Sequence, residues 1–375
     1  MPDEENRMMK VATVYTGQSM SQPVLLNLLN KYRDIELTMF KGSADKIKLL
    51  NLTHEHRSYT VEDVKINGQT ALWLTQRRLR KKWHEFLREN LDRSFDIVIG
   101  MNELATPAVE VADTYDIPSL FFIRNLETSG QEMYNPERGH IKNFRSADFG
   151  AKIQYPFFVE NFRSYKRGMK MADEVIANSE YVSKRLKNDF NVDSEIIYPP
   201  IELDQYKVEN DEDGYIGMVN PRNKEKGGDI FMNIVEDMPS EEFLAVGVFR
   251  DRELERRANS LDNLTHVGWC DNMRNFYKQT RMLLVPTQCN EAFGRVAAEA
   301  MVSGIPCVVS NRGGLPEVVG NTGEIVHEIE SIDAWKDAIQ QALTDHEPEA
   351  QMQRAKKFSA EKQGSKLNEV VEEIL

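Results

Sequence analysis

Short apolar runs recur along the chain, and most are followed by a segment with helical spacing. Residues 9–29 predict a strand, a glycine turn and a helix, and residues 93–125 predict a strand, a helix and a strand. The apolar runs are continuous rather than alternating, which is typical of strands buried on both faces of a sheet. Strands of this kind in alternation with helices predict a parallel, doubly wound α/β sheet.

Two segments interrupt this alternation. Residues 126–150 form a long polar stretch, and a loop of that length without regular structure is usually functional or mobile. Residues 196–206 contain two prolines and no helical period, after residues 161–190 have returned to helix, strand and helix. The alternation then starts again, with strand-like runs at residues 215–219, 243–249, 281–286 and 306–310.

This restart predicts two domains joined by a proline-containing linker. We assign residues 1–198 to an N-terminal domain, 199–206 to the linker and 207–375 to a C-terminal domain. Whether the last helix stays with the second domain or packs back on the first is left open. Ligands of such sheets bind beyond the carboxyl ends of the strands, so functional residues are expected in the loops that follow them.

Composition and charge narrow the class of protein. At roughly 150 residues per domain, 375 residues are enough for two cores. The net charge of −13 argues against a general nucleic-acid-binding protein. The three cysteines, Cys270, Cys289 and Cys307, fit neither a disulfide framework nor a zinc site, which favours a reducing cytoplasm. No apolar run is long enough to span a membrane, and the first ten residues are too polar for a signal peptide.

One motif carries a family resemblance. The segment NEAFGRVAAEAMVSGIPCVVSNRGGLPEVVG, residues 290–320, resembles the signature of retaining glycosyltransferases of family 4, which have the GT-B fold. Further segments resemble those of the family in the same order, at residues 172–186, 196–206, 217–231 and 267–294. The resemblance is strong over roughly residues 172–323, and the N-terminal half matches only by pattern.

The resemblance implies a fold and an activity. The fold is GT-B: two Rossmann-like, doubly wound parallel-sheet domains that face a cleft. The activity is transfer of a hexose from a UDP-sugar or GDP-sugar to a hydroxyl acceptor, which is a glycan, a lipid-linked molecule or a small molecule. The nucleotide sugar is a substrate, so no cofactor is expected.

The two acids of the motif, Glu291 and Glu299, bracket the expected start of a helix near Gly294. A helix N-terminus attracts phosphate, and glycine lets a ligand approach the backbone closely. Glu299 falls one turn inside the helix on the face of Arg295, where a carboxylate can accept hydrogen bonds from a ribose diol. Glu291 precedes the helix and can reach the hydroxyls or the anomeric carbon of the sugar. The alternative is an acid pair that only complements the helix dipole.

Cations follow the strand at residues 215–219. Lys226 matches the family lysine that contacts the diphosphate, whereas the family arginine often lies where this chain has Asn220. Arg222 is the candidate substitute, and Lys224 is either a third ligand or a solvated cation. Hydrogen bonds to a charged phosphate contribute roughly 1.5–3 kcal/mol and strengthen as the leaving diphosphate gains charge.

These arguments define the candidate site. We assign catalysis to Glu291, Lys226 and Arg222, and binding of the nucleotide sugar to Glu299, Gly294, Arg295, Val296, Phe293, Gly17 and Lys224. Gly17 follows the first strand, where a glycine turn is as common for structural reasons as for phosphate binding. Gly313 and Gly314 are expected to shape the floor of the site.

The N-terminal half departs from the family pattern. Many members carry a histidine after a mid-domain strand, whereas this chain has Arg124, Asn125 and Glu127 at that place. His140 lies in the polar stretch, and a lone loop histidine is usually a surface residue. Glu103 is a further candidate at the cleft edge, with a solvated role equally open. The acceptor-side residues therefore stay unassigned.

Residues 72–91 combine apolar positions at helical spacing with a run of cations from Arg77 to Lys82. A basic amphipathic helix with tryptophans can lie on an anionic lipid surface, which would place the protein on the inner face of the membrane. The alternative, which we favour, is a helix packed in the core with a solvated basic face.

The resemblance implies retention by attack on the face from which the diphosphate leaves, and the sequence shows no obvious nucleophile. No DxD-like cluster lies near the site, so we expect the reaction to be independent of metal. Two other functions remain open: a GT-B-like nucleotide-sugar epimerase or hydrolase, and a nucleotide-sugar-binding protein without catalysis.

Overall fold

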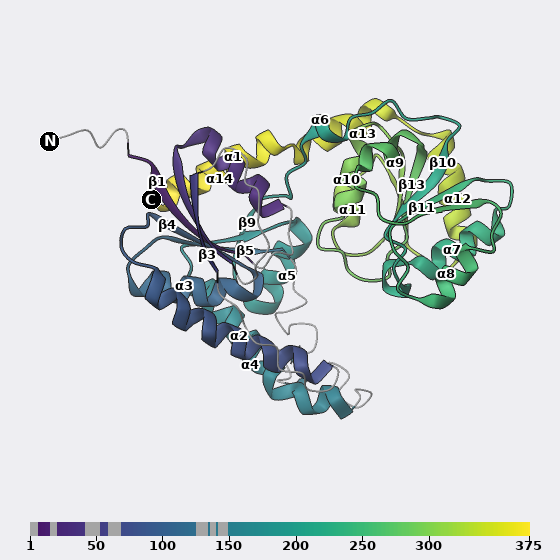
Figure 1. The fold of residues 1–375 in the computed structure, drawn as a ribbon. Coiled ribbons are helices and arrows are strands. Elements are labelled where there is room, and N and C mark those ends of the chain that lie inside the picture. Colours follow the sequence, from purple (N-terminus) through teal and green to yellow (C-terminus); the bar gives the residue numbers. More distant parts are fainter. Residues whose placement is uncertain are drawn as a thin grey trace. The chain divides into compact units, whose positions relative to one another are not determined.

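The structure is a computed structural model that describes residues 7–15, 21–41, 53–58, 69–124, 134–135, 140–141 and 149–375. The chain forms two compact units, each with its own sheet (Figure 1). Unit 1 comprises Met1–Tyr198 and Gln363–Leu375, and unit 2 comprises Pro199–Lys362. The last helix therefore belongs to unit 1 for most of its length.

Unit 1 contains a seven-stranded parallel sheet with the order β3-β2-β1-β4-β5-β8-β9. Its strands are β1 (Met9–Tyr15), β2 (Ile35–Lys41), β3 (Thr53–Ser58), β4 (Ile97–Met101), β5 (Ser119–Ile123), β8 (Glu174–Ala177) and β9 (Glu195–Ile196). Val11 of β1 pairs with Leu37 on one side and with Ile97 on the other. The strand order reverses between β1 and β4, as in a doubly wound fold.

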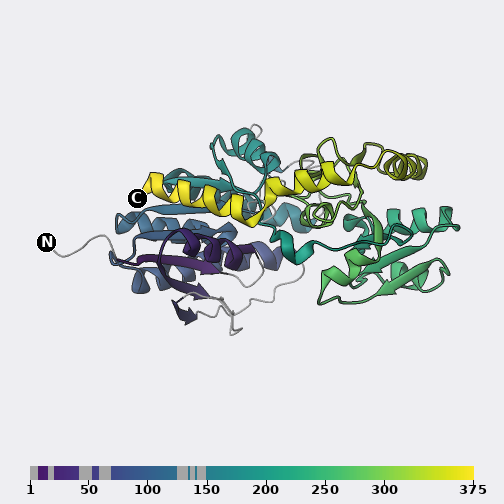
Figure 2. The same cartoon turned by 90° about the horizontal axis from the view of Figure 1, so that it is seen from above.

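Helices cover both faces of this sheet because its strands are apolar on both sides. Helices α1 (Ser21–Tyr32) and α14 (Ala360–Ile374) pack on the face that presents Val11, and they lie side by side in Figures 1 and 2. Helices α2 (Gln69–Asn90) and α3 (Ala105–Thr114) pack on the face that presents Ala12 and Val14. Helix α4 (Phe149–Met171) packs against α2 and α3, and α5 (Glu180–Phe190) joins β8 to β9.

The polar stretch at residues 126–150 is described only in part. There, β6 (Tyr134–Asn135) pairs antiparallel with β7 (His140–Ile141). The expectation of a loop without regular structure is therefore wrong for this short hairpin.

Unit 2 contains a six-stranded parallel sheet with the order β12-β11-β10-β13-β14-β15. Its strands are β10 (Tyr215–Val219), β11 (Phe243–Val246), β12 (Leu264–Val267), β13 (Thr280–Val285), β14 (Cys307–Ser310) and β15 (Glu324–Val326). The four strands predicted for this half, β10, β11, β13 and β14, are confirmed. The order reverses between β10 and β13, and a ligand site is expected beyond the carboxyl ends of these two strands.

Helices lie before, between and after the strands of unit 2. They are α6 (Leu203–Tyr206), η4 (Lys224–Lys226), α7 (Gly228–Asp237), α8 (Arg252–Ala258), α9 (Met273–Lys278), α10 (Arg295–Met301), α11 (Leu315–Val319), α12 (Ile332–Thr344), α13 (Pro348–Ala355) and η5 (Lys356–Phe358). The predicted helix start near Gly294 is confirmed, since Gly294 is the N-cap of α10. In the part of the chain that the structure describes, no helix combines the length and the apolar character needed to cross a bilayer.

Candidate functional site

A cavity of about 200 Å³ lies where the strand order of unit 2 reverses. Met218 and Val219 of β10 and Leu284 and Val285 of β13 form part of its wall. Five of the residues predicted from the sequence line it: Lys226, Glu291, Gly294, Arg295 and Val296. The structure thus brings together residues that are up to 70 positions apart, at the place where a doubly wound sheet binds its ligands.

Lys226 and Glu291 form an ion pair in this cavity, with Lys226 Nζ 2.5 Å from Glu291 Oε1. Their side chains are 39% and 24% exposed, so the pair is reachable by a ligand and yet partly shielded from water. Asn223 caps η4, because its Oδ1 accepts a hydrogen bond from the backbone N–H of Lys226 at 3.1 Å. A cation and a carboxylate are thereby held at adjoining positions of the wall.

The loop that carries Lys226 is fixed against the loop after β13. Gly227 has φ = 78°, and a Cβ at this position would lie 1.9 Å from the carbonyl oxygen of Pro286. The carbonyl of Glu225 accepts hydrogen bonds from the backbone N–H groups of Gln288 and Cys289. Glycine is required here because only a residue without a Cβ permits this approach and this φ.

The loop that carries Glu291 rests on the glycine pair after β14. The carbonyl of Glu291 accepts a hydrogen bond from the N–H of Gly314 at 2.7 Å. A Cβ on Gly313, which has φ = 61°, would lie 2.0 Å from the same carbonyl oxygen. The two glycines therefore position the backbone of Glu291. This is the way in which they shape the floor of the site, as expected from the sequence.

Glu299 lies behind the cavity wall rather than on it. The residue is only 5% exposed, and its two carboxylate oxygens have different partners. Arg295 Nε donates to Oε1 at 2.6 Å, and the hydroxyl of Tyr277 donates to Oε2 at 2.9 Å. Arg295 also donates through Nη2 to the hydroxyl of Tyr206 at 3.3 Å. The predicted sharing of a helix face by Glu299 and Arg295 is confirmed, and Arg295 is the member of the pair that lines the cavity.

The two tyrosines were not identified from the sequence. Tyr277 lies on α9 and Tyr206 at the end of α6, and no spacing relates them to α10. Burial, together with the charge of Glu299, raises the pKa of both hydroxyls, that of Tyr277 well above its ordinary value. Both hydroxyls remain neutral at physiological pH, and the hydroxyl of Tyr277, which donates to Glu299, fixes this carboxylate.

Replacing Tyr277 with phenylalanine tests this support. The variant removes one hydrogen bond to a buried carboxylate, and we expect the free energy of unfolding to fall by about 1–3 kcal/mol. Chemical denaturation measures it, and a double-mutant cycle with Glu299→Gln isolates the interaction. If the two effects add without coupling, Tyr277 does not support Glu299.

The other predicted residues do not line the cavity. Arg222 is half-buried and its backbone N–H donates to the carbonyl of Asn220 at 2.6 Å, whereas Lys224 is exposed. Phe293 is buried, and its ring packs edge-on against Phe358 at 5.0 Å. Asn220, with φ = 58°, lines the cavity at the position where the family often has its arginine. Gly17 lies outside the described residues.

Polar groups also meet at the carboxyl ends of the strands of unit 1. Asn102 Oδ1 accepts a hydrogen bond from the N–H of Arg124 at 2.9 Å, and Asn178 Nδ2 donates to the carbonyl of Arg124 at 2.8 Å. Glu103 lies beside them in η2 (Asn102–Leu104), but its side chain lies outside the described residues. Asn125 and Glu127 also lie outside the described residues, as does the side chain of His140.

The basic segment at residues 72–91 forms most of α2. Trp83 and Leu87 are buried in the core of unit 1, and Phe86 packs against them. These apolar side chains support core packing of this part of the helix and give no support to membrane contact.

Comparison with known proteins agrees with this geometry. Residues 213–345 match the family model described as glycosyl transferases group 1. An uncharacterized 41.2 kDa protein in the cps region of Klebsiella pneumoniae is 31% identical over 186 residues, which cover 42% of this chain and 49% of that protein. The lipopolysaccharide 1,2-N-acetylglucosaminetransferase of Salmonella typhimurium is 40% identical over 88 residues, 23% of each chain. The chain thus matches about half the length, or less, of these curated relatives.

Solved structures match over almost the whole chain. Sucrose-phosphate synthase from Thermosynechococcus elongatus has a TM-score of 0.73 at 18% identity and covers 97% of this chain and 98% of its own. Anabaena HepE, solved in complex with UDP and glucose, has a TM-score of 0.67 at 16% identity. The match covers 97% of this chain and 99% of HepE.

The fold and the site together define the class. The chain has the GT-B fold, with two Rossmann-like, doubly wound parallel-sheet domains, as the sequence predicts. The segment at residues 213–345, which contains the cavity and its ion pair, matches the glycosyl transferases group 1 family model. The resemblance to glycosyltransferases found in the sequence is thereby confirmed, whereas membership of family 4 and retention stay predictions.

Proposed function

We propose that this protein is a retaining glycosyltransferase that moves a hexose from a UDP-sugar or GDP-sugar to a hydroxyl acceptor without a metal ion. The observation that carries the proposal is the pair of Lys226 and Glu291 in the cavity at the strand-order reversal of a glycosyl transferases group 1 domain. A structure of the similar protein HepE contains UDP and glucose, which supports a nucleotide sugar as the donor.

In this proposal Lys226 binds the diphosphate. When the donor enters, its phosphates compete with Glu291 for the ammonium group, which lies within reach of both. The ammonium stabilises the negative charge that develops on the leaving diphosphate, and the fixed loop keeps it in place for this purpose. Gly294 brings backbone N–H groups to the same region, and Arg222 acts from the same loop after β10 that carries Lys226.

Glu291 and Glu299 contact the two ends of the donor. Glu291 accepts hydrogen bonds from the hydroxyls of the sugar, since its carboxylate faces the cavity beside Lys226. Glu299 accepts from the ribose through lone pairs that Arg295 and Tyr277 leave available, since each carboxylate oxygen can accept more than one hydrogen bond. Arg295 and Val296 form the wall against which the nucleotide lies.

The reaction breaks the bond between the anomeric carbon and the diphosphate oxygen and forms one between that carbon and the acceptor oxygen. The acceptor hydroxyl attacks on the face from which the diphosphate leaves, and its proton passes to the leaving phosphate oxygen. Positioning and charge stabilisation supply the rate enhancement, so neither a covalent intermediate nor a metal is needed.

A transfer assay tests the proposal. We expect turnover of a UDP-sugar or a GDP-sugar that depends on an added hydroxyl acceptor, a product with the anomeric configuration of the donor by NMR, and an unchanged rate in EDTA. Loss of the rate in EDTA with recovery in magnesium would refute metal independence. Donor turnover without an acceptor would indicate an epimerase or hydrolase, and tight donor binding without turnover a binding protein.

A further inference from the structure

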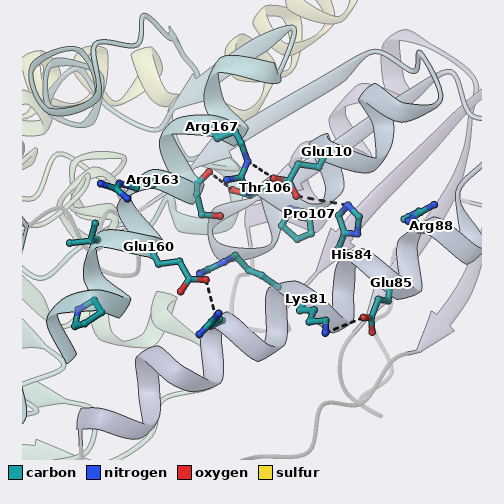
Figure 3. Close-up of a pocket in the computed structure, with 15 residues that line it drawn as sticks. Lys81, His84, Glu85, Arg88, Thr106, Pro107, Glu110, Glu160, Arg163 and Arg167 are labelled. Atoms are coloured by element: carbon teal, nitrogen blue, oxygen red, sulfur yellow. Dashed lines mark hydrogen bonds and ion pairs between the residues drawn. The ribbon is translucent and has the colours of Figure 1, made fainter. Parts of the chain in front are cut away.

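Unit 1 contains a larger cavity that the proposed function does not use. It has a volume of about 970 Å³ and lies between α2, α3 and α4, and we refer to it as the three-helix cavity (Figure 3). This volume is in the range of sites for small organic ligands, about 300–1,000 Å³. The described residues that line it all belong to helices of unit 1.

The lining of the three-helix cavity is basic although the protein is acidic. Among the described residues, six cationic side chains and three carboxylates line it, in a chain whose net charge is −13. The cations are Arg77, Arg80, Lys81, Arg88, Arg163 and Arg167. A local excess of positive charge in an acidic protein attracts anions to this place.

The carboxylates of the cavity are already engaged by some of the cations. Arg77 Nε lies 3.1 Å from a carboxylate oxygen of Glu160, and Arg167 Nε donates to Glu110 at 2.7 Å. His84 Nε2 lies 4.0 Å from the other oxygen of Glu110, and Figure 3 shows Arg167 and His84 directed toward this carboxylate. Glu110 and Glu160 therefore have cationic partners other than the remaining arginines.

Three arginines of the cavity have no such partner. Within the described ranges, no carboxylate lies at ion-pair distance from Arg80, Arg88 or Arg163. Arg88 and Arg163 are exposed, so water solvates them. Arg80 differs, because it is only 7% exposed and its Nη1 and Nη2 both lack a hydrogen-bond partner among the described residues.

A buried guanidinium without a partner is unfavourable, and proteins normally avoid it. Burial lowers the pKa of Arg80, although nearby Tyr165 and Glu160 raise it, and an arginine nevertheless stays charged in proteins. The packing of α2 against α3 and α4 holds this charge in place. Arg80 lines the cavity, so an anion bound there would lie beside this charge and offset it.

We propose that the three-helix cavity binds a phosphate group, with Arg80 as its buried anchor and Arg88 and Arg163 as its rim. The planar fork of arginine matches the spacing of two phosphate oxygens, and a doubly charged phosphate balances the excess positive charge better than a carboxylate does. The site is separate from the cavity of unit 2 and does not depend on the proposed function. The phosphate can belong to a soluble phosphoester or to a lipid headgroup.

The test titrates inorganic phosphate and glycerol 3-phosphate into the full chain carrying Lys226→Ala, a background chosen to weaken any phosphate binding at the proposed donor site of unit 2. We expect saturable binding by calorimetry, weakened about tenfold or more by Arg80→Met and severalfold by Arg163→Ala. Lys170→Ala is the matched control, because Lys170 is exposed on the same helix but does not line the cavity. Arg163→Ala keeps the test valid if Arg80→Met does not fold, because Arg163 is exposed.

Vesicle flotation distinguishes the source of the phosphate. Binding of the soluble anions without flotation assigns the site to a soluble phosphoester. Flotation with phosphatidic acid vesicles but not with phosphatidylcholine vesicles, reduced by Arg163→Ala and not by Lys170→Ala, assigns it to a headgroup. The proposal is overturned if neither the soluble anions nor the vesicles bind, or if binding is the same in both arginine variants and the control.

Discussion

Substitution of Lys226 by alanine is expected to lower kcat for sugar transfer by about 10²–10³-fold, the usual cost of removing one group that stabilises transition-state charge. Lys226 lines the cavity beside Glu291, and its ammonium is held 2.5 Å from that carboxylate. The effect on kcat should exceed the effect on KM, because the interaction strengthens as the diphosphate leaves. Steady-state kinetics with the preferred donor measure both.

Lys224→Ala is the matched control for this variant. Lys224 lies two residues away in the same helical turn, but it is exposed and does not line the cavity. Its removal should change kcat less than about threefold, since surface charges contribute little. Equal losses in the two variants would show that the loop acts through its overall charge and not through the position of Lys226.

Substitution of Gly227 by alanine is expected to reduce the free energy of unfolding by at least about 2 kcal/mol, from left-handed backbone strain and overpacking. The new Cβ would lie 1.9 Å from the carbonyl oxygen of Pro286, and a backbone atom cannot turn away as a side chain can. Thermal denaturation should show Tm lower by about 5 °C or more. Activity should fall too, because the strain moves Lys226.

Gly268→Ala provides the comparison within the same unit. A Cβ on Gly268 would meet nothing within 4 Å, and its φ is not in the left-handed region. This variant should leave Tm within about 2 °C of that of the wild type, in line with ordinary surface substitutions. A Tm for Gly227→Ala as high as that for Gly268→Ala would mean that the contact between the two loops is not tight in solution.

The sequence predicts the framework of unit 2 well, for a physical reason. A parallel sheet buried on both faces requires continuous apolar runs, so β10, β11, β13 and β14 are visible as such. β12 and β15 are harder to recognise, because they lie at the sheet edges, where β12 is partly exposed and β15 is partly half-buried. The helix start at Gly294 is also visible, since it follows from local backbone chemistry.

The sequence predicts many residues of the site, but it does not predict the contacts between them. The family motif identifies Lys226 and Glu291 separately, but their direct pairing depends on how the loops after β10 and β13 meet. The support of Glu299 by Tyr277 depends likewise on the packing of α9 against α10, which no local pattern encodes.

The basic run of α2 is a second case in which the sequence does not predict the surroundings of a side chain. From the sequence, Arg80 belongs to a solvated charged face, whereas the structure buries it between three helices. Helical spacing gives the direction of a side chain but not what another helix places over it. α4 comes about 70 residues later in the chain, and it is the element that encloses Arg80.

Calorimetric titration of UDP and of GDP into the wild-type protein and into Lys226→Ala tests the central claim most directly. Our account predicts that at least one of the two nucleotides binds to the wild type, and that its Kd rises about tenfold or more in Lys226→Ala, as expected for loss of a charge-assisted hydrogen bond. Lys224→Ala should bind as the wild type does. Absence of binding by both nucleotides, or binding that Lys226→Ala leaves unchanged, would contradict the assignment of the cavity in unit 2 as a nucleotide-sugar site.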